Sequence, residues 1–197
     1  MSLASSPSPV TWADPVRASL FDAWLAQLAP RHGLQPQTLQ IASADASFRR
    51  YLRILGAAGQ PARIIMDAPP EKENCHPFVH VARLMEAAGL HAPRVLEWDE
   101  ANGFMLLTDL GDATMMSALD PARPEAAQPL YLRALDVLLP WQQASRPAVL
   151  PPYDEALLRR ELDLFPEWYV APHRGVARGA AQQATLAQAF DRIVANS

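Results

Sequence analysis

Hydrophobic positions recur at helical spacing near the start of the chain. Across 16–28 the apolar residues return every three or four positions, which is the period of one helix face. Asp14 stands directly before Pro15, as an N-cap stands before the residue favoured at the first helical position. The pattern predicts a helix over 15–29, and we expect residues 1–14, rich in Ser and Pro, to form a flexible tail.

Strand and helix patterns alternate in the next part of the chain. Short runs rich in β-branched and aromatic residues, bounded by turn residues, are typical of strands. Such runs cover 39–42, 47–55, 62–66, 94–98 and 103–108, and one helical pattern lies among them at 77–88. Because most consecutive runs are joined by tight connections, we expect a single antiparallel sheet.

After the polar stretch 109–112 every remaining pattern is helical. The predicted helices cover 115–119, 129–143, 153–170 and 180–194, and Pro166 is expected to kink the third of them or to start a new turn. This order predicts an α+β, protein-kinase-like fold, with a five-stranded antiparallel N-lobe and a partial helical C-lobe. The N-lobe would cover 15–108, and the connector and truncated C-lobe would cover 109–197.

Composition narrows the function classes without choosing among them. Half of the 197 residues are hydrophobic and the formal net charge is −4, so nothing indicates a nucleic-acid partner. Cys75 is the single cysteine, which excludes a disulfide within the chain and a cysteine metal cluster. The sequence shows neither a secretory signal nor a membrane-spanning apolar stretch. We expect a cytoplasmic protein, with a monomer favoured and no membrane partner.

Five short motifs together resemble one family. They occur in the order SADASFRRY (43–51), MDAPPEKE (66–73), GLHAPRV (89–95), LTDLG (107–111) and LDLFPEWY (162–169). In this order the motifs are similar to those of a bacterial subgroup of the aminoglycoside-phosphotransferase family, the anomeric amino-sugar kinases of cell-wall recycling. The resemblance covers about residues 15–195.

The resemblance implies a nucleotide-dependent transfer of phosphate. The donor would be ATP or GTP with Mg²⁺, and the acceptor would be an amino sugar, N-acetylmuramate or N-acetylglucosamine, phosphorylated at C1. Two alternatives stay open. One is a kinase for another small hydroxyl compound such as an aminoglycoside, choline or homoserine, and the other is a non-catalytic nucleotide-binding or partner-binding domain.

The resemblance places the nucleotide phosphates at the turn between the first two strands. This turn has no glycine, but its small residues would still let a phosphate approach, and hydroxyl and guanidinium groups donate to phosphate oxygens. The candidates are Ser43, Asp45, Ser47 and Arg49. The competing interpretation is an ordinary hairpin turn, with Arg49 and Arg50 on opposite faces of the strand.

The resemblance also assigns the nucleobase to the connector. Leu107, Asp109 and Leu110 would present backbone groups or an apolar wall to the base, and Met66 would add to that wall; the competing interpretation is plain core. The third strand lacks the lysine typical of kinases, and the following helix lacks an obvious glutamate partner. Either an arginine of the first turn replaces the lysine, or metal ions carry that role.

Polar and aromatic residues of the penultimate predicted helix are candidates for sugar binding. Carboxylates bind hydroxyl groups and an indole stacks on a pyranose ring, which singles out Glu161, Asp163, Glu167 and Trp168. The competing interpretation is a helix with a solvated acidic side and a buried Trp168.

The residues that would perform catalysis and bind metal are not found in these 197 residues. The family takes its acceptor base from a His-x-Asp-x-x-x-x-Asn loop and its metal ligands from that loop and a later Asp motif. The sequence holds five histidines, none followed by Asp two positions later: His32, His76, His80, His91 and His173. We therefore assign no catalytic and no metal-binding residue, and expect this chain alone to lack kinase turnover.

Overall fold

The structure is a computed structural model, and it describes residues 10–44 and 48–196. The chain divides into two compact units, residues 1–145 and 146–197. No helix among the described residues is long and apolar enough to cross a membrane. The predicted boundary between the N-lobe and the connector, after Thr108, falls inside the first unit and stays a prediction.

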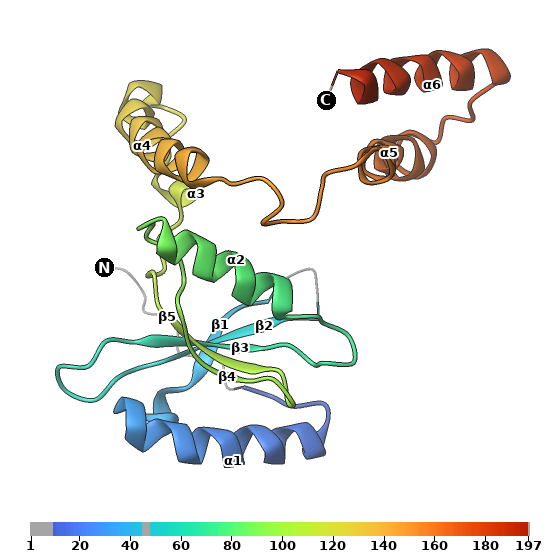
Figure 1. The fold of residues 1–197 in the computed structure, drawn as a ribbon. Helices are drawn as coiled ribbons and strands as arrows, with labels where there is room; N and C mark the ends of the chain where they lie inside the picture. The colour runs from blue at the N-terminus through green and yellow to red at the C-terminus, as the bar shows by residue number, and fades with distance from the viewer. Residues whose placement is uncertain (1–9, 45–47, 197) are drawn as a thin grey trace. The chain divides into compact units, whose positions relative to one another are not determined.

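A five-stranded antiparallel sheet forms the centre of the first unit (Figure 1). The strands are β1 (Gln40–Ala44), β2 (Arg50–Ile54), β3 (Arg63–Asp67), β4 (Val95–Asp99) and β5 (Phe104–Thr108), in the order β1-β2-β3-β5-β4. Every neighbouring pair is antiparallel. The sequence-based expectation of an α+β fold with one such sheet is confirmed, with strand ends moved by a few residues.

Helix α1 (Pro15–His32) packs on one face of the sheet. Asp14 caps it by accepting a hydrogen bond from the Val16 N–H at 2.8 Å, and Gly33 ends it in the left-handed conformation, with φ 59°. Its buried stripe meets the alternate side chains of β2, β3 and β5 that point toward it, and together they form the first core: Phe21, Leu25, Leu28, Ala29, Leu34, Leu52, Ile54, Ile65, Phe104 and Leu106.

Part of the predicted flexible tail is packed against this core. Val10 and Trp12 contact it, and the Trp12 ring lies 4.9 Å from the Phe21 ring. These contacts bury apolar surface of Val10 and Trp12 on the core, and the flexible tail over 1–14 stays a prediction. The prediction for residues 1–9 lies outside the described residues.

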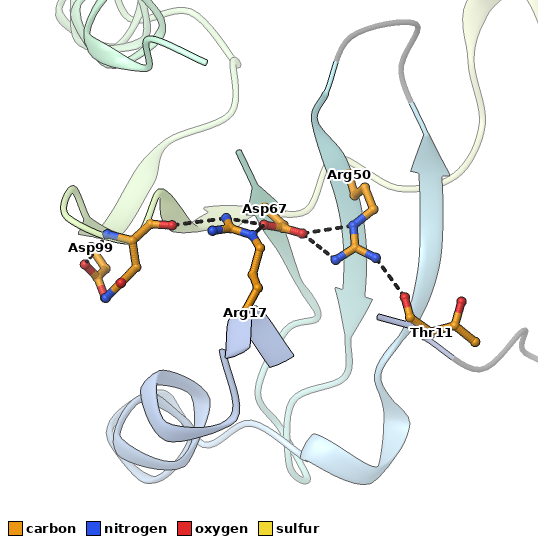
Figure 2. Close-up of polar contacts among 6 residues, drawn as sticks. Thr11, Arg17, Arg50, Asp67 and Asp99 are labelled. Carbon is orange, nitrogen blue, oxygen red and sulfur yellow. Dashed lines mark hydrogen bonds and ion pairs between the residues drawn. The ribbon is translucent and has the colours of Figure 1, made fainter. Parts of the chain in front are cut away.

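Asp67 is a buried charge on the α1 face, held between two arginines (Figure 2). Arg17 of α1 donates from Nε at 2.8 Å, and its Nη2 also contacts the carboxylate. Arg50 of β2 donates from Nε at 2.9 Å and from Nη2 at 2.5 Å. Arg17 Nη2 also donates to the Asn102 carbonyl at 3.0 Å, and Arg50 Nη1 donates to the Thr11 carbonyl at 2.9 Å. This cluster ties the helix, the sheet and the N-terminal segment together.

Helix α2 (His76–Ala87) packs on the opposite face of the sheet. Here the other set of alternate side chains forms a second, smaller core of Met66, Ala68, Cys75, Val79, Met105 and Leu107. Because side chains alternate along a strand, Ile65 and Asp67 face α1 while Ile64 and Met66 face α2. Leu107, the last core residue of β5 before the connector, lies on the α2 face.

The remaining elements are helical, as expected, with one correction. The first unit continues through α3 (Met115–Ala118), η2 (Pro124–Ala127) and α4 (Gln128–Ala144), and the second contains α5 (Glu155–Leu164), η3 (Phe165–His173) and α6 (Ala180–Ala195). The helix predicted over 153–170 is not one continuous α-helix. The α-helix ends at Leu164 and a π-helix begins at Phe165, next to Pro166, the residue at which a kink or a new turn was expected because it lacks the N–H that continues the α-helical pattern.

Candidate functional site

A cavity of about 400 Å³ lies on the α2 face of the sheet where β5 passes into the connector. Its size falls within the range of small-molecule sites. The sheet, α2, the segment before β4 and the connector all contribute to its wall: Ala42, Ser43, Tyr51, Arg53, Ile64, Phe78, Pro93, Leu107, Thr108, Asp109, Leu110, Gly111, Asp112 and Thr114.

The inner wall of the cavity is apolar and aromatic. Tyr51 and Ile64 lie on neighbouring strands, Leu107 comes from β5, and Phe78 comes from α2. These side chains belong to the second core or pack against it, so their positions are set by the fold. A wall of this kind accepts a flat, apolar surface such as a nucleobase.

The polar rim is organised by Arg53 of β2. Its Nε donates to Asp109 Oδ2 at 2.7 Å, and its Nη2 donates to Asp109 Oδ1 at 3.0 Å and to the Gly111 carbonyl at 2.7 Å. Asp109 Oδ1 also accepts the Gly111 N–H at 2.9 Å. Burial alone raises the pKa of Asp109, but these hydrogen bonds outweigh it and hold the pKa below its ordinary value.

The connector backbone offers an unused donor at the cavity. The Thr108 N–H bonds the Arg94 carbonyl at 3.1 Å, and Thr108 Oγ1 accepts the Arg94 N–H at 2.9 Å, so Thr108 is held by the segment before β4. Leu110, two residues later, lines the cavity, and within the described part of the chain its N–H donates to no other group.

Arg49 lies beside this cavity and pairs with Glu73. Its Nε donates to Glu73 Oε2 at 3.0 Å, while Glu73 Oε1 accepts the Phe48 N–H at 3.1 Å. Burial works to lower the pKa of Arg49, but hydrogen bonds to Glu73 and Tyr51 raise it above its ordinary value. The guanidinium carbon lies 6.0 Å from the Phe78 ring centre. A permanent cation is thus placed next to two residues of the cavity wall.

The structure brings together four of the residues predicted to bind nucleotide. Ser43, Leu107, Asp109 and Leu110 all line the cavity. Met66 does not: its side chain is fully buried in the second core, as the competing interpretation expected. The predictions for Asp45 and Ser47 lie outside the described residues.

Arg49 and Arg50 take opposite faces of the sheet. Arg50 binds Asp67 on the α1 face, whereas Arg49 lies beside Phe78 of α2. This is the arrangement that the simple hairpin interpretation predicted. It leaves a phosphate contact by Arg49 as a prediction and excludes Arg50 from the cavity.

Among the cavity residues that sequence reasoning missed, three bear on the chemistry of the site: Tyr51, Arg53 and Phe78. The signal that could have found two of them is the period of a strand, because Tyr51 and Arg53 are two positions apart and share a face. Phe78 lies in the first turn of α2, and its contact with the cavity depends on how that helix packs. The local sequence carries no comparable signal for it.

The four predicted sugar-binding residues lie in the second unit and are exposed. Glu161 and Asp163 belong to α5, and Glu167 and Trp168 to η3. Trp168 is 70% exposed, so the competing interpretation of a buried indole is wrong. The indole and the three carboxylates are accessible, and sugar binding by these residues stays a prediction.

Neither a metal site nor a reactive thiol forms among the described residues. No three His, Cys, Asp or Glu side chains within 10–44 and 48–196 gather closely enough to hold a metal ion. We assign no residue and no step to the Mg²⁺ that the resemblance implies. Cys75 is buried, which raises the pKa of its thiol and makes it a poor nucleophile.

Comparison with known proteins gives consistent similarities. Residues 38–196 match the model of the phosphotransferase enzyme family (APH). The N-acetylmuramate/N-acetylglucosamine kinase of Pseudomonas aeruginosa is 46% identical over 171 residues, covering 83% of this chain and 49% of the relative. The kinases of the same name from Pseudomonas putida and Neisseria meningitidis serogroup B are 47% and 37% identical, covering 75% and 87% of this chain and 42% and 50% of the relatives.

This chain spans about half the length of the curated relatives it matches. The family match nevertheless runs from the residues before β1 into α6, through the sheet, the connector and the second unit. On that match, and with a kinase-like sheet and a cavity at its connector, the chain belongs to the phosphotransferase enzyme family.

Proposed function

We propose that this chain provides the nucleotide-binding lobe and part of the acceptor-binding lobe of an ATP-dependent phosphotransferase that phosphorylates an amino sugar. The observation that carries the proposal is the cavity at the connector of a family member. In such a site the base would lie against Tyr51, Ile64 and Leu107, and the Leu110 N–H would bond its edge.

The phosphate end of the nucleotide would lie toward the β1–β2 turn. Arg49 supplies a cation there, and Glu73 orients it in the way that a glutamate orients the strand lysine in other kinases. The pair thus offers a substitute for the missing lysine and glutamate. Ser43, at the cavity wall, is a second candidate donor to phosphate oxygens.

The proposed acceptor is N-acetylmuramate or N-acetylglucosamine, phosphorylated at C1. Support comes from three relatives named as kinases of these sugars, at 37–47% identity. Glu161, Asp163, Glu167 and Trp168 are exposed and chemically suited to sugar hydroxyls and a pyranose face. An aminoglycoside or choline acceptor, and a non-catalytic nucleotide-binding role, are the alternatives that the experiments must separate.

Thermal denaturation of the 197-residue chain with ATP, GTP and ADP tests nucleotide binding, because a ligand of the native state raises the melting temperature. Ala42→Trp should abolish the increase, since Ala42 is exposed at the cavity wall. The matched control is Ala23→Trp, at an exposed position of α1 on the other face. Equal stabilisation of both variants by ATP would contradict the assignment of the cavity.

Acceptor binding is tested with N-acetylmuramate, N-acetylglucosamine, kanamycin and choline under the same conditions. Stabilisation by the amino sugars supports the proposal, stabilisation by kanamycin or choline supports the other kinases, and a response to nucleotide alone supports a non-catalytic role. With ATP and N-acetylmuramate we expect no turnover by this chain, because its sequence holds no His-x-Asp loop. Turnover comparable to that of the Pseudomonas aeruginosa relative would refute that expectation.

A further inference from the structure

Arg53 attaches the connector to the sheet. Thr108 is the last residue of β5 and is anchored to Arg94 by two hydrogen bonds. Beyond it, within the part of the chain that the structure describes, the hydrogen bonds that join 109–111 to the sheet all come from Arg53. The position of this segment relative to β2 therefore depends on one side chain.

The attachment is geometrically specific. A guanidinium that binds a carboxylate through two parallel hydrogen bonds fixes both the distance and the angle between the two groups. The same Nη2 also binds the Gly111 carbonyl, and Asp109 holds the Gly111 N–H. Gly111 has a φ of 93°, in the region that favours glycine, which permits this tight turn. The turn is held by the hydrogen bonds between Asp109 and Gly111 and by those from Arg53. Leu110, with its unused N–H, lies inside this closed turn.

We propose that Arg53 is a positioning residue for the nucleobase: it acts through Asp109 and Gly111 to hold the Leu110 N–H where the edge of the base meets the connector. The inference rests on the proposed nucleotide site, and Arg53 lies outside the five motifs that predicted nucleotide contacts. If it holds, replacing either Arg53 or Asp109 weakens binding of the base to the same extent. Arg53 makes no contact with the phosphates in this role.

A direct contact between Arg53 and the nucleotide phosphates is the rival role. Arg53 lines the cavity, and its Nη1 makes no hydrogen bond to the described residues. The two roles predict different ligand dependence. Loss of a positioning residue lowers the affinities for adenosine and ATP by the same factor, whereas loss of a phosphate contact lowers the affinity for ATP far more than that for adenosine.

The test is isothermal titration calorimetry of the 197-residue chain with adenosine and with ATP. We expect Arg53→Met and Asp109→Asn each to lower the affinity for both ligands by about tenfold. The double variant should lose no more affinity than the more affected single variant, since both substitutions break the same interaction. Arg53→Lys, which keeps the charge but not the fork, should give an intermediate loss. The control is Arg31→Met, which breaks an exposed pair with Glu97 of β4 and should leave both affinities unchanged.

Three results would overturn the inference. Unchanged affinities in Arg53→Met and Asp109→Asn, with only a lower melting temperature, would assign the pair a purely structural role. A loss confined to ATP in Arg53→Met, with tighter ATP binding in Asp109→Asn, would assign the direct phosphate contact. Failure of the wild-type chain to bind either ligand would refute the proposed nucleotide site itself, which distinguishes that failure from the first two.

Discussion

The two faces of the sheet each hold an arginine–aspartate cluster, and the two clusters differ in what they join. Asp67, with its side chain 2% exposed, lies between Arg17 and Arg50 and connects α1, the sheet and the N-terminal segment (Figure 2). Asp109, with its side chain 10% exposed, binds Arg53 and connects one strand to the wall of a cavity. The first cluster lies within the core, whereas the second borders a site.

This difference separates stability from function on physical grounds. The two cationic partners of a buried carboxylate stabilise the fold mainly because an unpaired buried charge is strongly unfavourable. A single pair whose carboxylate keeps more contact with water contributes less to stability but can still determine the position of a loop. Mutations at the two clusters should therefore affect different measurements.

The largest expected effect is the loss of the charge at Asp67. Asp67→Asn leaves Arg17 and Arg50 without their counter-charge in a buried site, and we expect the free energy of unfolding to fall by about 3 to 5 kcal/mol. Urea denaturation measures this change. A fall no larger than that of Asp109→Asn would break the comparison between the clusters.

The two arginines around Asp67 should not be equivalent. The Arg17 side chain is 14% exposed and that of Arg50 is 34% exposed. We expect Arg17→Met to lower the free energy of unfolding by about 2 kcal/mol, as for a buried hydrogen-bonded charge, and Arg50→Met by about 1 kcal/mol because water replaces part of its contacts. The same urea denaturation series ranks them, and the reverse order would show that burial does not decide their contributions.

Breaking the Asp109 cluster should cost less stability still. We expect Arg53→Met and Asp109→Asn each to lower the free energy of unfolding by about 0.5 to 1 kcal/mol, since the Asp109 carboxylate, with its side chain 10% exposed, keeps more contact with water than that of Asp67 at 2%. Arg31→Met, at an exposed surface pair, is the control and should be nearly neutral. A loss at Asp109 as large as that at Asp67 would mean that the connector is part of the folding core.

The smallest effect concerns pH. The pKa of Asp109 in the folded chain lies below its ordinary 3.8, so its contribution is complete above that value and is lost as the pH falls through the lower folded pKa. The difference in free energy of unfolding between wild type and Asp109→Asn should stay constant from about pH 8 to about pH 5 and shrink only below 3.8. A difference that disappears already near pH 5 would contradict the lowered pKa.

Much of the fold was predictable because its signals are local. The apolar spacing of α1, its Asp14 cap and the short strand runs are properties of neighbouring residues. Contacts between residues distant in sequence gave no such signal. Trp12 packs on Phe21 and on Arg50, whose guanidinium carbon lies 4.2 Å from its ring centre, and nothing in the sequence around Trp12 indicates either contact.

The candidate site was only partly predictable. The motif LTDLG located the connector, and with it Leu107, Asp109 and Leu110 at the cavity. Arg53 was missed because a single arginine in a strand gives no sign of its partner 56 positions later. Met66 was assigned to the wall of the base pocket but lies in the second core. The sequence does not distinguish the two positions, since a strand residue beside a cleft and one in the core can carry the same apolar side chain.

The sequence by itself determined the order of the elements, the family resemblance and the place of the connector, because these depend on local periodicity and on short motifs. Only the tertiary structure decided which charges meet. Asp67 and Asp109 have the same side chain, yet the packing of α1 buries the first between Arg17 and Arg50. The alternation of β2 directs Arg53 to the other face, where it binds the second at the edge of a cavity. The physical reason is that burial and pairing are properties of a folded surface, which residues far apart in the chain form together.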